Sequence, residues 1–300
     1  MNNDISSLTI NDYLNHSPNP DRKSGERTWH QSSREFPLVS VCTLVRNGEK
    51  TLAQTIDSVK CQTYPNIEYI IIDGASTDGT LEIIDQHSDH ISYWVSEKDL
   101  GAVDGANKAI SYAQGEFIFF ISSDDWADPN LIKHAIETQK NTGADFVFGN
   151  TSYYTDDMLE FTQKGDSNYA TKICYLMPRI NTPSMVMKKE CYKQIGLYNL
   201  RYKIAPDYEW VLRLHIYGGV GVYDSRININ HRLGGISTSN LSAVLNEVRH
   251  VSIQHGCSRS RAMWVYVISY SRTRLRQISK KLLPPLIYNF MMKFIRRDYS

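Results

Sequence analysis

Four short apolar runs alternate with polar tips and amphipathic helices in the first half of the chain. The helices carry apolar residues at helical spacing, as at Leu52, Ile56 and Val59. The last of these runs, Phe117 to Ile121, is continuous instead of alternating with polar residues, which is typical of a strand covered on both faces. Repeated units of this kind predict an α/β fold with a mostly parallel sheet flanked by helices and joined by right-handed crossovers. The runs are Leu38 to Val45, Ile67 to Ile72, Ile91 to Val95 and Phe117 to Ile121.

The pattern changes after Asn150, where tyrosine-rich pieces replace the long runs. Two of them flank Asp156-Asp157, a turn candidate, and are expected to be antiparallel strands. Residues 1–36 are rich in Asn, Ser, Asp and Pro and favour a flexible lead or a loosely docked segment. We predict four regions: the lead at 1–36, an α/β half at 37–150, an α+β half at 151–240 and a basic helical region at 241–300. The later elements expected are strands at Phe146–Phe148, Thr151–Tyr154, Leu159–Gln163, Met185–Met187, Val220–Tyr223 and Ile227–Asn230, and a helix at Pro206–Tyr217.

Composition and charge indicate a globular chain and narrow its partners. The 300 residues carry 33 Lys and Arg against 32 Asp and Glu, so a net charge of +1 gives no reason to expect nucleic acid as a partner. The five cysteines are dispersed without a Cys-x-x-Cys pair, which predicts neither a disulfide framework nor a zinc site. Reduced thiols favour a cytoplasmic protein. The N-terminus lacks the apolar core of a secretory signal, and no apolar run is long enough to span a membrane.

Polar residues follow the predicted strands at the points where the strands end. The carboxyl ends of parallel strands meet at one edge of a sheet, where ligands bind in α/β folds. Asp124 and Asp125 end the most apolar run, and paired carboxylates suit a divalent cation, which prefers hard oxygen ligands. A polar turn before the next helix explains the same two residues equally well. The residues expected to gather at this edge are Arg46, Asp73, Asp104, Asp124 and Asp125.

Five polar segments stand at predicted strand or helix ends. They are Val39-Ser40-Val41-Cys42-Thr43 with Arg46-Asn47, Ile71-Ile72-Asp73-Gly74-Ala75-Ser76-Thr77-Asp78-Gly79-Thr80, Ser96-Glu97-Lys98-Asp99-Leu100-Gly101 with Asp104, Phe120-Ile121-Ser122-Ser123-Asp124-Asp125, and Ala205-Pro206-Asp207-Tyr208-Glu209. Together and in this order they resemble the family 2 glycosyltransferases of the GT-A fold over about residues 37 to 240. The second and third segments look most like those of bacterial enzymes that build surface polysaccharides. The resemblance implies a Rossmann-like GT-A domain, with a nucleotide-binding half at 37–150 and an acceptor half at 151–240.

This resemblance also implies an inverting, metal-dependent transfer of a sugar from a nucleotide-sugar donor, expected to be UDP-linked, to a glycan or lipid-linked acceptor. Asp207 would be the catalytic base that takes the acceptor's proton, with Glu209 in reserve. A first-turn acid behind Pro206 is the structural alternative for Asp207. Asp124 and His231 would hold Mg²⁺ or Mn²⁺ against the donor diphosphate, although a structural, hydrogen-bonded role for His231 stays open.

The remaining implied contacts are to the donor. Asp73 would accept a hydrogen bond from uracil, and an Asp-Gly turn is the alternative. For Asp104 the alternative is an acid in the first turn of a helix, which the helix dipole favours. Arg46 in a surface ion pair and Lys98 as a solvated cation are likewise open. The full set of implied donor contacts is Thr43, Arg46, Asp73, Lys98, Asp104, Ser122, Ser123 and Asp125.

One position departs from the family pattern and keeps rival functions open. Ser122 stands where the commonest metal motif has its first acid, so chelation by two carboxylates is not expected. A non-catalytic glycan- or nucleotide-binding module is one rival. A sugar-nucleotidyltransferase is the other, but it would ordinarily place a glycine-rich loop after the first strand, and Thr43-Leu44-Val45-Arg46-Asn47 has no such glycines.

The C-terminal region is one-sided in charge. After Ser258 it carries ten Arg and Lys residues and a single acid, Asp298, interleaved with apolar residues such as Trp264 and Leu275. This composition fits amphipathic helices on the inner face of an anionic cell membrane, where lipid-linked acceptors would lie. A packed helix pair with a solvated basic face, or a dimer contact, fits it equally well.

Overall fold

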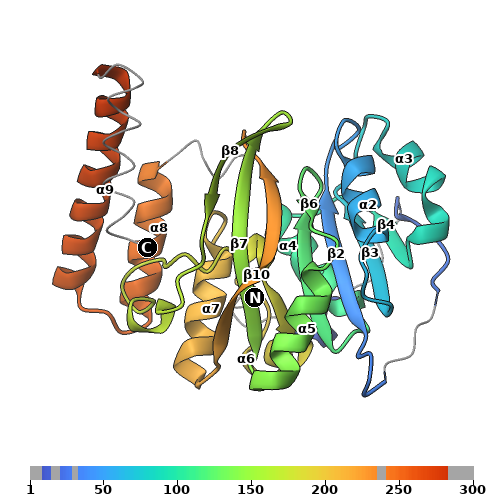
Figure 1. The fold of residues 1–300 in the computed structure, drawn as a ribbon, viewed down its shortest axis with the longest axis horizontal. Helices are drawn as coiled ribbons and strands as arrows, with labels where there is room; N and C mark the ends of the chain where they lie inside the picture. The colour runs from blue at the N-terminus through green and yellow to red at the C-terminus, as the bar shows by residue number, and fades with distance from the viewer. Residues whose placement is uncertain (1–8, 15–20, 29–32, 235–240, 283–300) are drawn as a thin grey trace. The chain divides into compact units, whose positions relative to one another are not determined.

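The computed structural model describes residues 9–14, 21–28, 33–234 and 241–282. They divide into two units, one drawn from Met1–Ile173 and Met177–Gly235 and the other from Cys174–Leu176 and Ile236–Ser300. The first unit contains the sheet and its helices, and the second contains a helix pair (Figure 1).

Four parallel strands form the first half of the sheet and coincide with the four apolar runs. They are β2 (Val39–Val45), β3 (Ile67–Asp73), β4 (Tyr93–Ser96) and β5 (Phe117–Ser122), in the order β4-β3-β2-β5. Because all four run in one direction, their carboxyl ends meet at one edge. The predicted α/β architecture with a mostly parallel sheet is confirmed.

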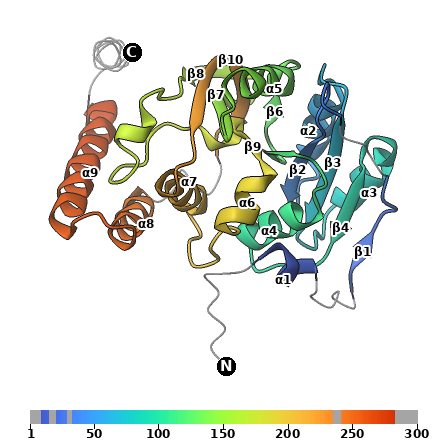
Figure 2. The same ribbon diagram turned by 90° about the horizontal axis from the view of Figure 1, so that it is seen from below.

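Helices cover both faces of these strands (Figures 1 and 2). Val39, Val41 and Val45 point into one apolar cluster with Leu52 and Leu131 from two of the helices, and a third helix lies against the opposite face. Burial on both faces explains why the apolar runs do not alternate. The helices of this half are α2 (Leu52–Lys60), α3 (Thr80–Gln86), α4 (Ala102–Tyr112), which is the one on the opposite face, and α5 (Leu131–Thr142).

The second half of the sheet mixes strand directions. A short antiparallel strand, β9, lies between β5 and β7, so β7 runs parallel to the first four strands and pairs in parallel with β10. β8 forms the predicted antiparallel hairpin with β7. The elements are β6 (Trp126–Ala127), β7 (Phe146–Thr155), β8 (Met158–Gln163), β9 (Val186–Lys188), β10 (Gly221–Arg232), α6 (Lys189–Ile195), α7 (Pro206–Tyr217) and the 3₁₀ turns η3 (Tyr169–Thr171) and η4 (Thr182–Ser184).

Two pairs of predicted short strands are single long strands in the structure. β7 joins the two pieces that Gly149-Asn150 separates in the sequence, and β10 continues through an irregularity between Tyr223 and Asn228. A Cβ on Gly149 would lie 2.2 Å from the Ile227 carbonyl oxygen. Glycine at this position therefore marks a close approach of two backbones and not the end of a strand.

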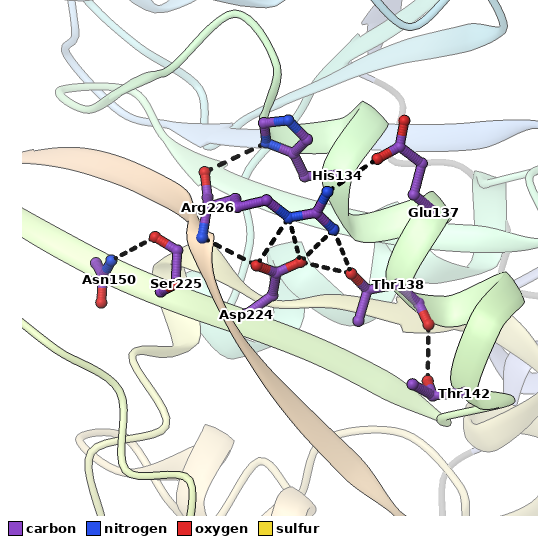
Figure 3. Close-up of polar contacts among 8 residues, drawn as sticks. All are labelled: His134, Glu137, Thr138, Thr142, Asn150, Asp224, Ser225 and Arg226. Atoms are coloured by element: carbon purple, nitrogen blue, oxygen red, sulfur yellow. Dashed lines mark hydrogen bonds and ion pairs between the residues drawn. The ribbon is translucent and has the colours of Figure 1, made fainter.

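The irregular segment of β10 is tied to α5 by a polar network (Figure 3). The Arg226 guanidinium donates to the Asp224 carboxylate, with Nη2 2.8 Å from Oδ2, and also pairs with Glu137. The Thr138 hydroxyl donates to the same Asp224 oxygen at 2.5 Å. Partial burial raises the pKa of Asp224, but the hydrogen bonds from Arg226 and Thr138 outweigh burial and lower this pKa to about 2.

Asp224→Asn is expected to lower the free energy of unfolding at pH 7 by about 1 kcal/mol, a figure reduced for the solvent screening of Arg226. A depressed carboxyl pKa stabilises the fold above the pKa of the unfolded chain, about 3.9. The difference between wild type and variant should therefore be constant near neutrality and shrink as the pH falls from about 4 towards 2. Urea unfolding across this range measures it, with Asp85→Asn on the exposed face of α3 as the control. A difference that grows in acid would contradict the assignment.

The described parts of residues 1–36 are docked on the sheet unit, unlike the flexible lead that composition favours. The Tyr13 hydroxyl, in α1 (Ile10–Leu14), donates to Asp104 Oδ1 at 2.8 Å. β1 (Lys23–Ser24) pairs antiparallel with β4. Arg27 Nη2 lies 2.6 Å from Oε1 of Glu68, whose side chain is fully buried. The structure favours the docked alternative, but the anchoring residues could not be predicted because isolated polar anchors leave no hydrophobic period.

The second unit contains α8 (Leu241–Gln254) and α9 (Arg259–Leu282), which confirms the predicted C-terminal helical region. None of the helices that the structure describes is long and apolar enough to cross a membrane. Two consecutive prolines, Pro284-Pro285, would break a helix, but they lie outside the described residues, as do Lys293, Arg296, Arg297 and Asp298.

Candidate active site

The loops after β2 and β3 are held together at the carboxyl edge of the sheet. Gly74 N donates to the Val45 carbonyl at 2.9 Å, and Gly48 N donates to Thr80 Oγ1 at 2.9 Å. Asn47 adopts a left-handed φ of 56° and accepts a hydrogen bond from Thr77 N at 2.9 Å. This bonding leaves the Arg46 side chain exposed at the edge, where a phosphate could reach it.

Asp73 ends β3, as predicted, but its carboxylate is fully buried. It accepts hydrogen bonds from Ser76 N at 3.0 Å and from the hydroxyls of Ser76 and Ser96, both at 2.5 Å. These bonds favour the turn interpretation, because a direct bond to a donor base would require the turn to open. Contact between Asp73 and uracil stays a prediction.

Thr43, predicted to contact the donor, is a buried strand residue, and this contact stays a prediction. It lies inside β2, two residues before the strand ends, and is fully buried. Its hydroxyl lies 3.0 Å from the Tyr69 hydroxyl of the neighbouring strand. The exposed side chain that follows this strand belongs to Arg46.

Asp104 occupies the first turn of α4, the structural alternative given for it. Its carboxylate is buried and accepts hydrogen bonds from the Tyr13 hydroxyl and, at 3.1 Å, from Leu100 N. Lys108 Nζ lies 3.6 Å from Asp104 Oδ2 and 2.9 Å from Glu97 Oε1. Asp104 therefore organises the start of α4, whereas Lys98 nearby is exposed and could reach a phosphate.

The segment after β5 places four predicted residues side by side with different exposures. Ser122 is exposed, Ser123 and Asp124 are partly buried, and Asp125 is fully buried. Among the described residues, Asp124 has no hydrogen-bond or ion-pair partner, so its carboxylate oxygens are available to a ligand. Asp125 is not available to a nucleotide-sugar donor in the same way, because both of its carboxylate oxygens are hydrogen-bonded within the protein.

Asp125 pairs with His231 across the sheet. Its Oδ2 lies 2.9 Å from His231 Nδ1, and its Oδ1 accepts from Arg232 N at 3.2 Å. Burial raises the pKa of Asp125. Burial lowers the pKa of His231, but the bond to Asp125 and the charges of Asp125 and Asp124 outweigh it and raise this pKa. The sequence around His231 predicts a flexible loop, but the structure places this residue in β10. A strand and a buried carboxylate therefore hold its ring.

The side chains of Asp124 and His231 supply part of a ligand set for a divalent cation. Within the described part of the chain, no three His, Cys, Asp or Glu side chains are grouped to hold a metal ion. Asp124 and His231 nevertheless each keep a free ligand atom, and a carboxylate bonded to the other ring nitrogen is the usual support for a metal-binding histidine. These two residues could hold a cation whose remaining ligands come from a diphosphate and water.

Asp207 stands in the first turn of α7, where the sequence predicts the catalytic base. Thr182 Oγ1 donates to Asp207 Oδ2 at 2.5 Å, and Tyr208 N donates to Asp207 Oδ1 at 2.8 Å. The helix begins at Pro206, so the N-terminal dipole of α7 favours the ionised carboxylate. These contacts orient an acceptor-only group that is still partly exposed.

Glu209, the reserve base, has a structural role. Its side chain is buried and forms two bonds with Arg213, Nε to Oε1 at 2.8 Å and Nη2 to Oε2 at 3.1 Å. Arg213 also donates to the carbonyls of Ile195 and Leu197. A buried carboxylate engaged in this way holds α7 to the end of α6, and the role of Glu209 as a reserve base stays a prediction.

Residues from both halves of the sheet unit line a pocket of about 300 Å³. Ser122, at the end of β5, and Asp207 line it from opposite halves. Much of its wall is apolar, with α4 contributing Ala102 and Val103. Sequence reasoning missed Thr182, Tyr198 and Lys203, which also line it, because they lie in loops without a periodic signal.

Comparison with known proteins decides the family. The family model of glycosyl transferase family 2 matches residues 40–195, more than half of the chain. The chain belongs to this family. The match contains Arg46, Asp73, Asp104 and the Ser122–Asp125 segment, but it ends before Asp207.

Relatives that are named glycosyltransferases, and one solved structure, are similar to this chain. An uncharacterized glycosyltransferase of Rickettsia typhi is 28% identical over 68% of this chain, and the chain covers 66% of that protein, just under two thirds. The putative teichuronic acid biosynthesis glycosyltransferase TuaG of Bacillus subtilis is 34% identical over 40% of this chain and 49% of its own length. The crystal structure of S. aureus TarS 1–349 in complex with UDP-GlcNAc has a TM-score of 0.57 at 17% identity, covering 75% of this chain and 69% of that one. This last likeness shows a shared GT-A fold.

Proposed function

We propose that this family 2 member is an inverting glycosyltransferase that moves a sugar from a UDP-sugar to a hydroxyl of a glycan or lipid-linked acceptor in bacterial polysaccharide assembly. One observation carries the proposal: Asp207 lines the same pocket as Ser122, which ends β5 at the carboxyl edge of the parallel strands. A base from the acceptor half thus faces the place where a donor's sugar would lie. The UDP-GlcNAc complex of TarS and the name of TuaG support this donor and this pathway class.

The chemistry assigned to Asp207 is proton removal. Its carboxylate takes the proton of the acceptor hydroxyl as the hydroxyl oxygen bonds to the anomeric carbon. The bond from that carbon to the diphosphate breaks in the same displacement, so configuration inverts and no covalent intermediate is needed. The bonds from Thr182 and Tyr208 N hold the base in place before substrate arrives.

Positively charged groups at the carboxyl edge of the sheet would balance the negative charge of the leaving diphosphate. Arg46 and Lys98 are exposed there and supply positive charge. A divalent cation, Mg²⁺ or Mn²⁺, would neutralise further charge on the leaving group when bound. Asp124 and His231 would hold it, and Asp125 would keep the His231 ring oriented.

Asp124→Asn is expected to raise the Mn²⁺ concentration needed for half-maximal transfer about 10- to 100-fold, because it removes the one carboxylate charge that is free to meet the cation. Mn²⁺ titration of the initial rate, started from chelator-treated protein, measures the change, and Asp85→Asn on exposed α3 controls for charge. Full activity of the wild type in excess chelator would remove the metal from the proposal and leave Asp207 untouched.

The donor assignment is tested by a panel of UDP-, GDP- and dTDP-sugars in thermal unfolding with Mn²⁺. Selective binding to the folded state raises the midpoint temperature, and a saturating UDP-sugar should raise it by several degrees. Release of UDP during incubation with acceptor glycans then reports transfer. Binding without any release would favour the non-catalytic module, and incorporation of a sugar 1-phosphate into a nucleotide sugar would favour the nucleotidyltransferase.

A further inference from the structure

All the charged residues of the last described helix, α9, are positive. It runs for 24 residues from Arg259 to Leu282. Its sequence contains no Asp or Glu. Its seven positive residues are Arg259, Arg261, Arg272, Arg274, Arg276, Lys280 and Lys281. Such a helix repels a second copy of itself and is attracted to an anionic surface.

An apolar stripe runs the length of the same helix. It consists of Trp264, Val267, Leu275, Ile278 and Leu282, whose side chains are between 51% and 76% exposed. At 3.6 residues per turn, these five positions fall within about 80° of the helix circumference. Scattered exposed apolar residues need no explanation, but five on one narrow face form a binding surface.

This stripe is not the face that packs on α8. α8 and α9 lie side by side (Figures 1 and 2). Ala262 of α9 is buried, and Tyr266 contacts α8 through the Ser242 hydroxyl at 3.5 Å and the Arg249 guanidinium over its ring at 5.7 Å. Ala262 and Tyr266 lie roughly opposite the stripe on the helix circumference. The helix pair expected from composition therefore forms, and the described residues of this unit leave the apolar face uncovered.

Arginines border the stripe on both sides. At 100° per residue, Arg272 lies about 100° from the stripe's centre on one side, and Arg274 about 60° from it on the other. Both are exposed, and Arg274 Nε donates to the Tyr270 hydroxyl at 3.1 Å. An apolar centre with cationic borders matches the layering of a bilayer surface, where acyl chains lie beneath anionic phosphates.

We propose that α9 binds the surface of an anionic lipid bilayer, lying in its plane with the apolar stripe towards the acyl chains and the bordering arginines on lipid phosphates. It lies on the membrane and does not cross it, in keeping with its charge. A second copy of the chain is a poorer occupant, since pairing two stripes would bring two sets of seven positive charges together. The proposal does not depend on the transfer reaction.

The direct test is cosedimentation of the full chain with vesicles of phosphatidylcholine and phosphatidylglycerol in equal parts, compared with phosphatidylcholine alone. The double variant Leu275→Ser with Ile278→Ser is expected to bind the anionic vesicles about tenfold or more weakly, because it removes two stripe residues without changing charge. The matched control is Met158→Ser with Leu159→Ser, two apolar residues of β8 with similar exposure. The control should bind like wild type.

A second variant tests the electrostatic part. Arg272→Gln with Arg274→Gln should weaken binding to the anionic vesicles and reduce its dependence on salt, because two phosphate contacts are lost. Wild-type binding that is equally strong on phosphatidylcholine alone, or unchanged binding by the stripe variant, overturns the proposal. So does a wild-type dimer in sedimentation velocity that the stripe variant converts to monomer while neither binds vesicles.

Discussion

Asp207→Asn is expected to lower the rate of sugar transfer about 10³-fold and to leave the affinity for the nucleotide-sugar donor unchanged, because removal of a positioned general base typically costs a factor in this range. Asparagine has nearly the same shape: its side-chain oxygen can accept the hydrogen bond from Tyr208 N, and its amide nitrogen can donate to the Thr182 hydroxyl, so the start of α7 should keep its geometry. What it cannot do is take a proton. The loss should therefore appear in kcat and not in donor binding.

Initial rates of UDP release with acceptor present, together with donor titration by calorimetry, separate these two quantities. Asp85→Asn makes the same chemical change on exposed α3 and should be silent. Thr182→Val removes the hydroxyl that orients the base and should lower kcat by about tenfold without abolishing it, since misplacement of a base is less severe than its loss. Retained turnover in Asp207→Asn would exclude this residue as the base.

Arg27→Ala is expected to lower the free energy of unfolding by about 3 to 5 kcal/mol, the usual effect of leaving a buried charge without its partner. Glu68 is fully buried, and Arg27 Nη2 is its ion-pair partner at 2.6 Å. The remaining contacts of this carboxylate, from the Ser40 hydroxyl and Gln114 N, are single hydrogen bonds from neutral groups. In a domain of this size such a loss lowers the midpoint of thermal unfolding by about 10 °C.

A double-mutant cycle with Glu68→Gln tests whether buried charge is the cause. Because glutamine carries no charge, Arg27→Ala should be much less destabilising in the Glu68→Gln background than in the wild type. Lys23→Ala removes an exposed cation four residues earlier and should change stability by less than about 0.5 kcal/mol. Equal effects of Arg27→Ala in both backgrounds would show that packing of the arginine stem, and not its charge, is responsible.

The regular part of the fold was predictable because burial on both faces leaves a record in the sequence. The runs around Val41, Ile71 and Phe119 are mostly apolar and do not alternate regularly with polar residues, since helices cover both sides of the sheet. The ends of the long strands were not, because β7 passes through Gly149 with its backbone against Ile227, a contact across the sheet that no local pattern contains. The anchor between Arg27 and Glu68 was hidden for the same reason, with 41 residues separating its partners.

The candidate site was predictable in its position more than in its roles. Strand and helix ends correctly indicate where Ser122, Asp124 and Asp207 stand, because topology brings those ends to one edge. Whether a polar side chain at such an end is free for a ligand depends on its neighbours in space. Asp73 accepts a hydrogen bond from Ser96, and Glu209 is paired with Arg213. The amino-acid type at a position is the same whether its side chain is engaged by neighbours or free for a ligand.

The docking of Tyr13 and Arg27 has a consequence for the size of the autonomous folding unit. The family match begins at residue 40, yet Tyr13 bonds to Asp104 and Arg27 neutralises Glu68, both inside that match. A fragment that starts at Pro37 would lose β1 and keep the rest of the sheet with every candidate catalytic group, but it would bury Glu68 without its arginine. The N-terminal segment therefore acts as an internal counter-ion and strap, and we expect such a fragment to be less stable than the full chain although it contains the whole family match.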